Sequence, residues 1–176
     1  MLGSFACVDT TSYARHRILS EEKSTMEPQH PHLDFVIHSR KAMESAAMPD
    51  VPHVVVSITT SPFDEARIPS SPHCLGILRL AFFDSDLPAE EDGPDGLFSR
   101  DDARQIWRFI LPLHEKLRCI VLHCNAGVSR SPGVAAALSK VLCGDDQAFF
   151  ERYRPNQRVY TLVRDVFAKE FSLPST

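Results

Sequence analysis

The chain has 176 residues, enough for one globular domain and little more. Hydrophobic residues make up 43% and charged residues 24%, both near the averages for folded proteins, so a disordered or fibrous chain is excluded. The formal net charge of -4 provides no general attraction to nucleic acids or anionic membranes. No apolar run approaches the ~18 residues that a membrane span needs. We therefore expect no nucleic-acid partner and no membrane partner.

The cysteine pattern and the N-terminus predict a cytoplasmic location. The five cysteines are an odd number without a CxxC pair, which is unlike a disulfide framework and fits a reducing compartment. Residues 1–8 lack the basic start and the long apolar centre of a secretory signal. No spacing of His and Cys residues is typical of a zinc site, so we expect no metal and no other cofactor.

The chain divides near residue 31. Residues 1–31 are mostly polar, with few large apolar residues in any period, and predict a flexible extension. Residues 32–176 contain the apolar runs of a folded domain. Within this domain three runs rich in apolar or β-branched residues predict strands, at 33–38, 52–60 and 74–83.

The segments that connect these strands predict a helix and a long loop. A helix is predicted over 39–48, because Ser39 can cap it and Pro49 follows it. After the third strand the chain enters an acidic loop at 84–96, with Pro and Gly residues that no regular element tolerates. A long loop at the end of a strand is a common position for functional residues.

The second half begins with a helix. Ser99 with Asp102 predicts a capping box, and Pro112 predicts a kink near the end of that helix. A short apolar strand follows at 119–123, and then a tight loop and a helix with Ser131 as its cap and Pro132 as its first residue.

The helix after the tight loop is predicted to stop at Gly144. A short helix from Asp145 and a last helix over 159–171 complete the chain, and Asn156 lies in the turn between them. Alternating strands and helices predict a single α/β domain, with a central, mostly parallel sheet flanked by helices.

The strand, loop and helix around Cys124 carry the clearest chemical signal. Ligands of such sheets bind at the carboxyl ends of the strands, and Cys124 directly follows a strand. Arg130 follows six residues later, at the start of a helix. Backbone amides of the loop, the helix dipole and the Arg130 guanidinium can together hold a phosphate. The predicted phosphate-binding residues are Asn125, Ala126, Gly127, Val128, Ser129 and Arg130.

The same positive field acts on the thiol of Cys124. A helix N-terminus and a neighbouring cation favour the thiolate, which is the nucleophilic form. His123 is placed to order the loop by hydrogen bonding and to help maintain the thiolate. Ser131 can donate its hydroxyl to the sulfur when a phosphocysteine breaks down. These residues predict a nucleophile directed at phosphorus.

The stretch HCNAGVSRS, from His123 to Ser131, resembles the HCxxGxxR(S/T) signature of the cysteine-dependent protein tyrosine phosphatase superfamily. Over roughly Leu33 to Phe171 the chain is similar to the small dual-specificity-phosphatase-like branch, of the compact kind found in bacteria. The resemblance implies a tyrosine phosphatase-like catalytic domain that hydrolyses phosphomonoesters through a phosphocysteine at Cys124. It also implies that Arg130 binds phosphate and that an Asp on a mobile loop is the general acid.

Several carboxylates could supply that acid. Asp84 directly follows the apolar strand and is our first choice, and Asp86 is the second. Asp84 lies 40 residues before Cys124, whereas the family's usual separation is shorter. Asp92 lies 32 residues before Cys124 and fits that separation better, so it remains an alternative. An insertion in the acidic loop would reconcile Asp84 with the family's separation.

The loop also bears on the substrate. Asn125, Ala126, Val128 and Ser129 carry no positive charge, which disfavours a polyphosphorylated ring and leaves a phosphorylated protein or a small phosphomonoester. One alternative is a binding module with an idle phosphate cradle, as in a pseudophosphatase. A weaker alternative is sulfur transfer or arsenate reduction, because both also use a thiolate near an Arg.

Overall fold

The computed structural model describes residues 3–6, 33–88 and 95–171. Within these ranges no helix has the length and apolar character that a membrane crossing requires. The strands, in chain order, are β1 (Gly3–Ala6), β2 (Asp34–Ser39), β3 (His53–Thr59), β4 (Cys74–Ala81) and β5 (Cys119–Cys124).

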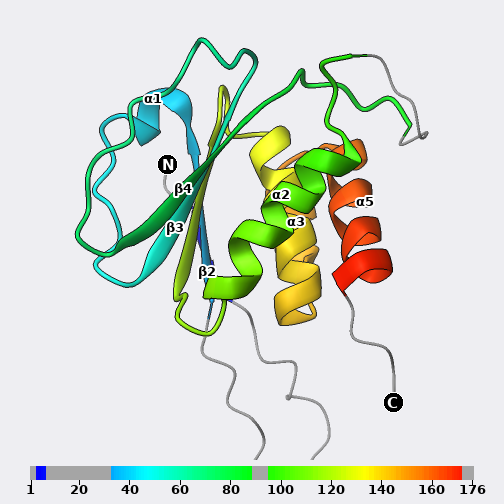
Figure 1. Cartoon of the computed structure of the whole chain (residues 1–176). Coiled ribbons are helices and arrows are strands. Elements are labelled where there is room, and N and C mark those ends of the chain that lie inside the picture. Colours follow the sequence, from blue (N-terminus) through cyan, green and yellow to red (C-terminus); the bar gives the residue numbers. More distant parts are fainter. Residues whose placement is uncertain (1–2, 7–32, 89–94, 172–176) are drawn as a thin grey trace, which may run out of the picture.

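The strands form one sheet in the order β1-β2-β5-β3-β4 (Figure 1). Strands β2, β5, β3 and β4 are all parallel, and β1 pairs antiparallel with β2 at one edge. The predicted, mostly parallel α/β sheet is therefore confirmed. Part of the predicted extension joins this sheet, since Gly3 pairs with Ile37. The rest of that extension, 1–2 and 7–31, lies outside the described residues.

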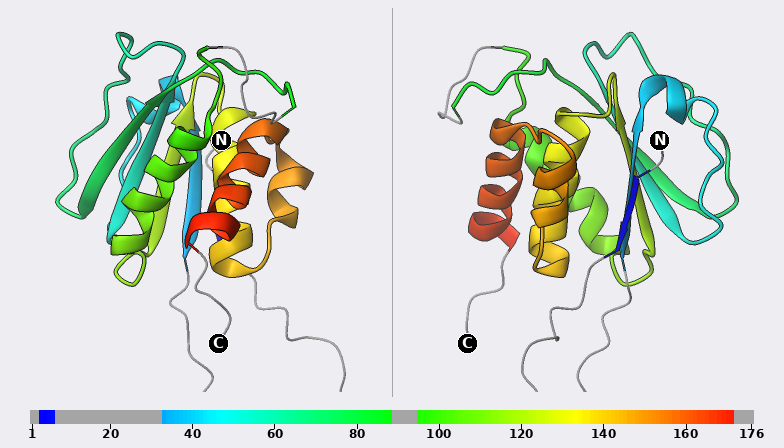
Figure 2. Two further views of the ribbon diagram at one scale, coloured as in Figure 1. Left: turned by 45° about the vertical axis from the view of Figure 1, so that its right-hand side comes forward. Right: turned by 180° about the vertical axis from the view of Figure 1, so that it is seen from behind.

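The helices are α1 (Arg40–Met43), α2 (Arg100–Ile110), α3 (Arg130–Cys143), α4 (Gln147–Arg152) and α5 (Gln157–Val166), with a 3-10 turn at Leu111–Leu113 and a π turn at Phe167–Phe171. Helices α2, α3 and α5 cover one face of the sheet, and the short α1 lies on the other side (Figure 2). Helices α3 and α5 pack beside each other, as do α2 and α5. The arrangement has a large core under three helices and a smaller one near α1.

Most of the predicted elements are present, and their ends have clear causes. The Ser99 side chain accepts from Asp102 N, and the Asp102 side chain accepts from Ser99 N, which confirms the predicted capping box. Helix α2 gives way to the 3-10 turn that contains Pro112. Helix α1 is shorter than the predicted 39–48, because Met43 is its only buried residue and no further apolar face stabilises it.

The central strands explain why the start of the loop after Cys124 is held firmly. Every residue of β3 and of β5 is buried, so both strands are fixed from the two faces of the sheet. Behind them Trp107 is fully buried and donates from Nε1 to the Val163 carbonyl at 2.7 Å. Strand β5 thus delivers Cys124 to the carboxyl edge of the sheet on a rigid support.

The described cysteines differ from the sequence-based expectation at one position. Cys74, Cys119 and Cys124 are free, but Cys143 is disulfide-bonded. The sequence predicted no framework of disulfides, and one disulfide-bonded cysteine does not make one. Burial, followed by the charge of Asp34, raises the pKa of Cys119 to about 12, so this thiol stays protonated and unreactive.

Candidate active site

Cys124 lies at the last position of β5 and its side chain is enclosed by the loop that follows. Its Sγ accepts hydrogen bonds from Gly127 N and from Ser131 Oγ, each at 3.2 Å. The residue is 2% exposed. Two donors that converge on one sulfur stabilise negative charge on it. The predicted Cys124 and Ser131 are therefore brought together.

The loop depends on the conformation of Gly127. Its φ is 70°, in the left-handed region that favours glycine. A Cβ at this position would lie 2.7 Å from the backbone of His38 and from Ser39 N at the end of β2. Arg40 N also donates to the Asn125 carbonyl at 3.1 Å. The loop between Cys124 and Arg130 is thus packed directly against the start of α1.

Ser131 has a different position from the one predicted for it. Helix α3 begins at Arg130, with Ser129 at the N-cap and no side-chain capping bond. The prediction that Ser131 caps this helix is wrong, because Ser131 is the second helical residue and its hydroxyl donates to Cys124 Sγ. Pro132 is accordingly the third residue of the helix and not the first. Gly144 does end the helix as predicted, in the left-handed conformation.

Arg130 is buried beneath the loop and is 3% exposed. Its Nη1 donates to the carbonyls of Phe82 and Thr59, at 2.8 and 3.1 Å, and these residues follow and end the two neighbouring strands. Its Nε is buried and has no hydrogen-bond partner among the described residues. A buried guanidinium with an unused donor is suited to an anion that supplies the missing acceptor.

Asp84 contacts the loop between Cys124 and Arg130. Its Oδ1 accepts from Ser129 Oγ at 2.7 Å and from Asn156 Nδ2 at 3.0 Å. Its Oδ2 lies 3.8 Å from Arg130 Nε, and its side chain remains 44% exposed. The carboxylate is held in place and is still open to solvent, as a group that exchanges protons with a substrate must be.

The other two candidate acids have different positions. Asp86 Oδ1 accepts from Gln157 N at 2.8 Å, so this carboxylate is occupied at the N-terminus of α5. Asp92 lies outside the described residues. Asp84 is thus the candidate that the described structure brings to the loop, with Asn156 as a partner that the sequence placed only in a turn.

His123 is fully buried behind Cys124, and its Nε2 lies 2.7 Å from Ser57 Oγ on the neighbouring strand β3. Burial lowers the pKa of His123 to about 4, so the imidazole is neutral near pH 7. It therefore supports the loop by position and supplies no positive charge. Ser57 was not predicted, because only strand pairing brings it opposite His123.

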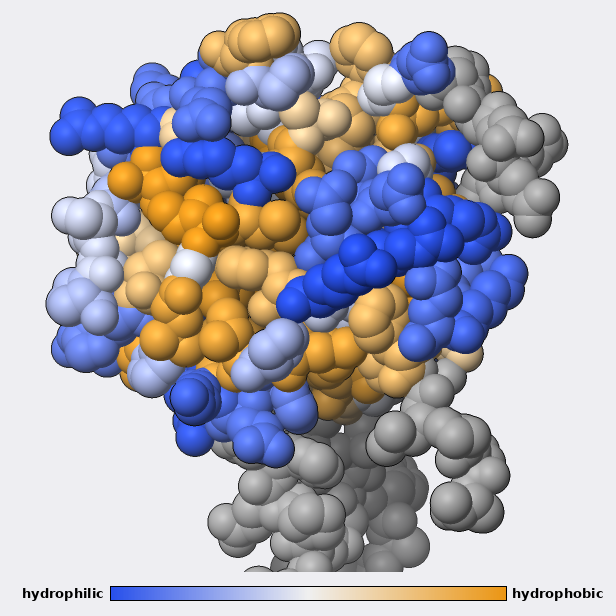
Figure 3. All heavy atoms as spheres, viewed as in Figure 1, coloured by the Kyte–Doolittle hydropathy of each residue, from blue (hydrophilic) through white to orange (hydrophobic). Residues whose placement is uncertain are grey.

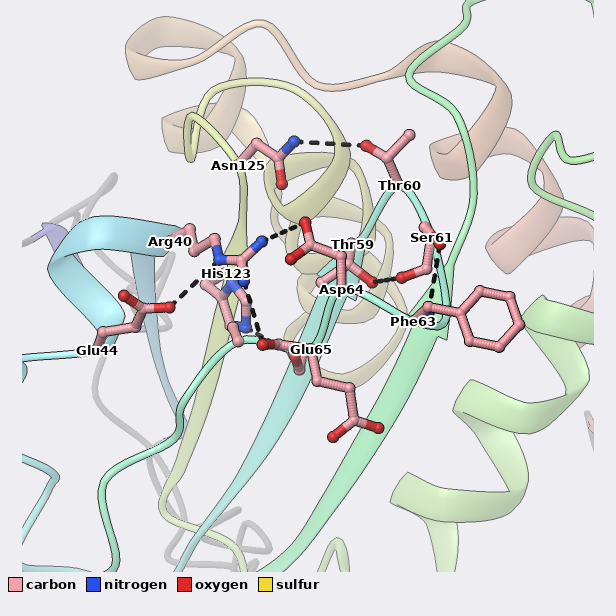
Figure 4. Close-up of polar contacts among 12 residues, drawn as sticks. Arg40, Glu44, Thr59, Thr60, Ser61, Phe63, Asp64, Glu65, His123 and Asn125 are labelled. Atoms are coloured by element: carbon pink, nitrogen blue, oxygen red, sulfur yellow. Dashed lines mark hydrogen bonds and ion pairs between the residues drawn. The ribbon is translucent and has the colours of Figure 1, made fainter.

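The side of the site next to α1 is a network of polar contacts (Figure 4). Asn125 Nδ2 donates to Thr60 Oγ1 at 3.4 Å, and Arg130 Nη1 reaches the same oxygen at 3.3 Å. Arg40 donates from Nη1 to Asp64 Oδ2 at 2.6 Å. The loop after β3 is thereby tied to the loop between Cys124 and Arg130, a relationship that no sequence motif indicated.

The sequence matches no protein-family model, and no curated protein matches it. Solved structures do match. One is the human tyrosine phosphatase-like serine/threonine/tyrosine-interacting protein, with a TM-score of 0.53 and 15% identity over 78% of this chain and 93% of that chain. Another is human DUSP28, with a TM-score of 0.50 and 16% identity over 75% of this chain and 86% of that chain. The predicted resemblance is confirmed at the level of fold: the domain is dual-specificity-phosphatase-like.

Proposed function

We propose that the protein is a cysteine-dependent phosphomonoester hydrolase of the protein tyrosine phosphatase type. The observation that carries this proposal is the convergence on Cys124 Sγ of Gly127 N and Ser131 Oγ, beside the unused Nε of Arg130. A sulfur held by two donors at the base of an anion site is suited to nucleophilic attack on phosphorus. Asp84, which accepts a hydrogen bond from Ser129 of the same loop, donates and accepts the proton in the reaction.

In the first step the Cys124 thiolate attacks phosphorus. A bond forms between Sγ and phosphorus as the bond from phosphorus to the ester oxygen breaks. The protonated carboxyl of Asp84 gives its proton to the departing oxygen, so the alcohol or phenol leaves neutral. Arg130 Nε and the loop amides stabilise the negative charge on the three equatorial oxygens.

In the second step a water molecule attacks the phosphocysteine. The Asp84 carboxylate takes a proton from that water, an oxygen–phosphorus bond forms and the sulfur–phosphorus bond breaks. The electron pair of the broken bond returns to Sγ, where the hydroxyl of Ser131 donates its hydrogen bond to the thiolate. Inorganic phosphate is released, and the starting state is restored.

We propose a phosphorylated protein or a small phosphomonoester as the substrate. Apart from Arg130, the loop residues Asn125, Ala126, Gly127, Val128 and Ser129 carry no positive charge. Replacing Cys124 by Ser tests the mechanism, because serine keeps the side-chain shape but is a far weaker nucleophile. We expect Cys124→Ser to abolish hydrolysis of p-nitrophenyl phosphate and to retain vanadate binding. Turnover retained by this variant would exclude the phosphocysteine.

A second candidate is a binding module that holds phosphorylated partners without hydrolysis. It is favoured by one observation, that a protein similar in fold is described as a phosphatase-like interacting protein. Vanadate or phosphopeptide binding by the purified protein, with no turnover that depends on Cys124, would establish this function in place of the first.

A further inference from the structure

The loop that follows β3 holds one large apolar side chain fully in water. Phe63 is 97% exposed, the highest value among the exposed large hydrophobic residues. In Figure 4 its ring points away from the cluster of Arg40 and Asn125. In the space-filling view, hydrophobic side chains stand out at the upper edge of the molecule (Figure 3). Exposing an aromatic ring is unfavourable unless a partner covers it.

The loop is held in one conformation from both sides. On one side, the Arg40 guanidinium bonds to Asp64 Oδ2 at 2.6 Å and to the Glu65 carbonyl at 3.1 Å. On the other, Arg79 of β4 lies 3.4 Å from Glu65 and donates to the Ala66 carbonyl at 3.2 Å. Because the loop is already ordered, a contact with Phe63 carries little further entropic cost.

A pocket of about 240 Å³ lies under this loop. Its lining residues come from β3, β4, α2 and the loop itself: Ser57, Thr59, Pro62, Glu65, Arg79, Leu80, Ala81, Asp102 and Gln105. Its charges are already engaged, since Arg79 pairs with Glu65 and Asp102 accepts from Ser99 in the capping box. The remaining lining is mixed: Pro62, Leu80 and Ala81 offer contacts to an apolar side chain, and Ser57, Thr59 and Gln105 are polar.

Thr59 is shared between the pocket and the candidate active site. This residue lines the pocket, and its carbonyl accepts from Arg130 Nη1 at 3.1 Å. The loop that carries Phe63 also begins at this site, because Thr60 Oγ1 lies 3.3 Å from Arg130 Nη1. A phosphate held by Arg130 therefore places the residues that flank it beside this loop. A small phosphomonoester has no flanking side chain to contact this loop, whereas a phosphorylated polypeptide has one.

We infer that the loop at 60–65 and the pocket beneath it recognise an apolar side chain that flanks the phosphorylated residue of a polypeptide, with Phe63 as the main contact. This inference rests on the proposed function, because the phosphate in the cradle fixes the position of the peptide. The substrate class is thus a phosphoprotein with an apolar flank.

The test uses the Cys124→Ser protein and fluorescent phosphopeptides, with phosphotyrosine or phosphothreonine flanked by Leu or by Gly. We expect the Leu peptide to bind at least about tenfold more tightly than the Gly peptide, as measured by anisotropy. Phe63→Ala should reduce this ratio to about one. Phe150→Ala removes another exposed Phe, 40% exposed on α4, and should keep the ratio. Thermal unfolding checks that each variant folds.

Each outcome separates the two proposals. A ratio near one, a ratio unchanged by Phe63→Ala, or binding of neither peptide overturns the inference. Hydrolysis of p-nitrophenyl phosphate by the intact protein is measured in parallel and tests the proposed function without any flanking residue. Turnover with no flank preference leaves the function standing and removes the inference. A Phe63-dependent preference without turnover supports the recognition site and removes the hydrolase.

Discussion

Asn156, at the N-cap of α5, donates from Nδ2 to Oδ1 of Asp84 at 3.0 Å, across 72 residues of sequence. Its own Oδ1 accepts from Val159 N at 3.0 Å, so the same side chain starts a helix and positions the candidate acid. Ser129 holds the same oxygen of Asp84. With Oδ1 occupied by two donors, Oδ2 is the oxygen left to carry the proton that the proposed mechanism requires.

Asp84→Asn is therefore expected to lower kcat by a factor on the order of 10² to 10⁴, because the leaving oxygen loses its proton donor. The loss should be larger for phenyl phosphate than for p-nitrophenyl phosphate, whose leaving group needs the proton less. Steady-state kinetics with both substrates measure it. Asp86→Asn is the matched control and should mainly affect stability. A larger loss in Asp92→Asn would assign the acid to Asp92.

Ser131→Ala removes the hydroxyl that donates to Cys124 Sγ at 3.2 Å. A hydrogen bond to a charged group contributes about 1.5 to 3 kcal/mol, so departure of the thiolate should slow by roughly 10- to 100-fold. Formation of the phosphocysteine should change less. Rapid-quench experiments would then detect a burst of product and an accumulated phosphoenzyme. Equal slowing of both steps, without a burst, would contradict the role of Ser131 in the second step.

Gly127→Ala places a Cβ 2.7 Å from the backbone of β2, at a φ of 70°. We expect turnover to fall at least about tenfold and stability to fall by more than the ~1 to 2 kcal/mol that left-handed strain alone costs. Gly144→Ala is the matched control, because Gly144 has a φ of 83° and no atom within 4 Å of its Cβ position. The free energy of unfolding of Gly144→Ala should fall only by the cost of left-handed strain, and the variant should keep its activity. Similar losses in both variants would show that the contact with β2 is unimportant.

His123 predicts a dependence of stability on pH. Its pKa is about 4 in the folded protein and near 6.5 when unfolded, so the unfolded state binds more protons between these values. The contribution of the neutral His123 to the free energy of unfolding is fully present above about pH 6.5. It decreases as the pH falls, by roughly 3 kcal/mol at most by pH 4. Urea unfolding at several pH values measures this effect. As the pH is lowered, the free energy of unfolding should decrease less for His123→Asn than for the parent protein.

His114→Asn provides the control for that series, because His114 is exposed. Its stability should follow the parent curve at every pH. Parallel curves for the parent protein and His123→Asn would mean that His123 is not held in its neutral form by burial.

The sequence predicted the alternation of strands and helices and the loop between Cys124 and Arg130, because both are local signals. The capping box at Ser99 and the stop at Gly144 are likewise local, and both are present. Ser131 shows the limit of this approach. Its side chain suits a helix cap, but its actual partner is a sulfur seven residues earlier. The local sequence preferences of Ser131 could not decide between the helix N-terminus and Cys124 Sγ as its hydrogen-bond partner.

What the sequence alone determined was the class of fold and the position of the candidate nucleophile, since hydrophobic periodicity and short motifs act over a few residues. Only the tertiary structure decided which side chains surround Cys124. Ser57 reaches His123 through strand pairing, and Asn156 reaches Asp84 through the docking of α5. Such contacts join residues 66 and 72 positions apart, and they depend on how the sheet and helices pack, which no short stretch of sequence encodes.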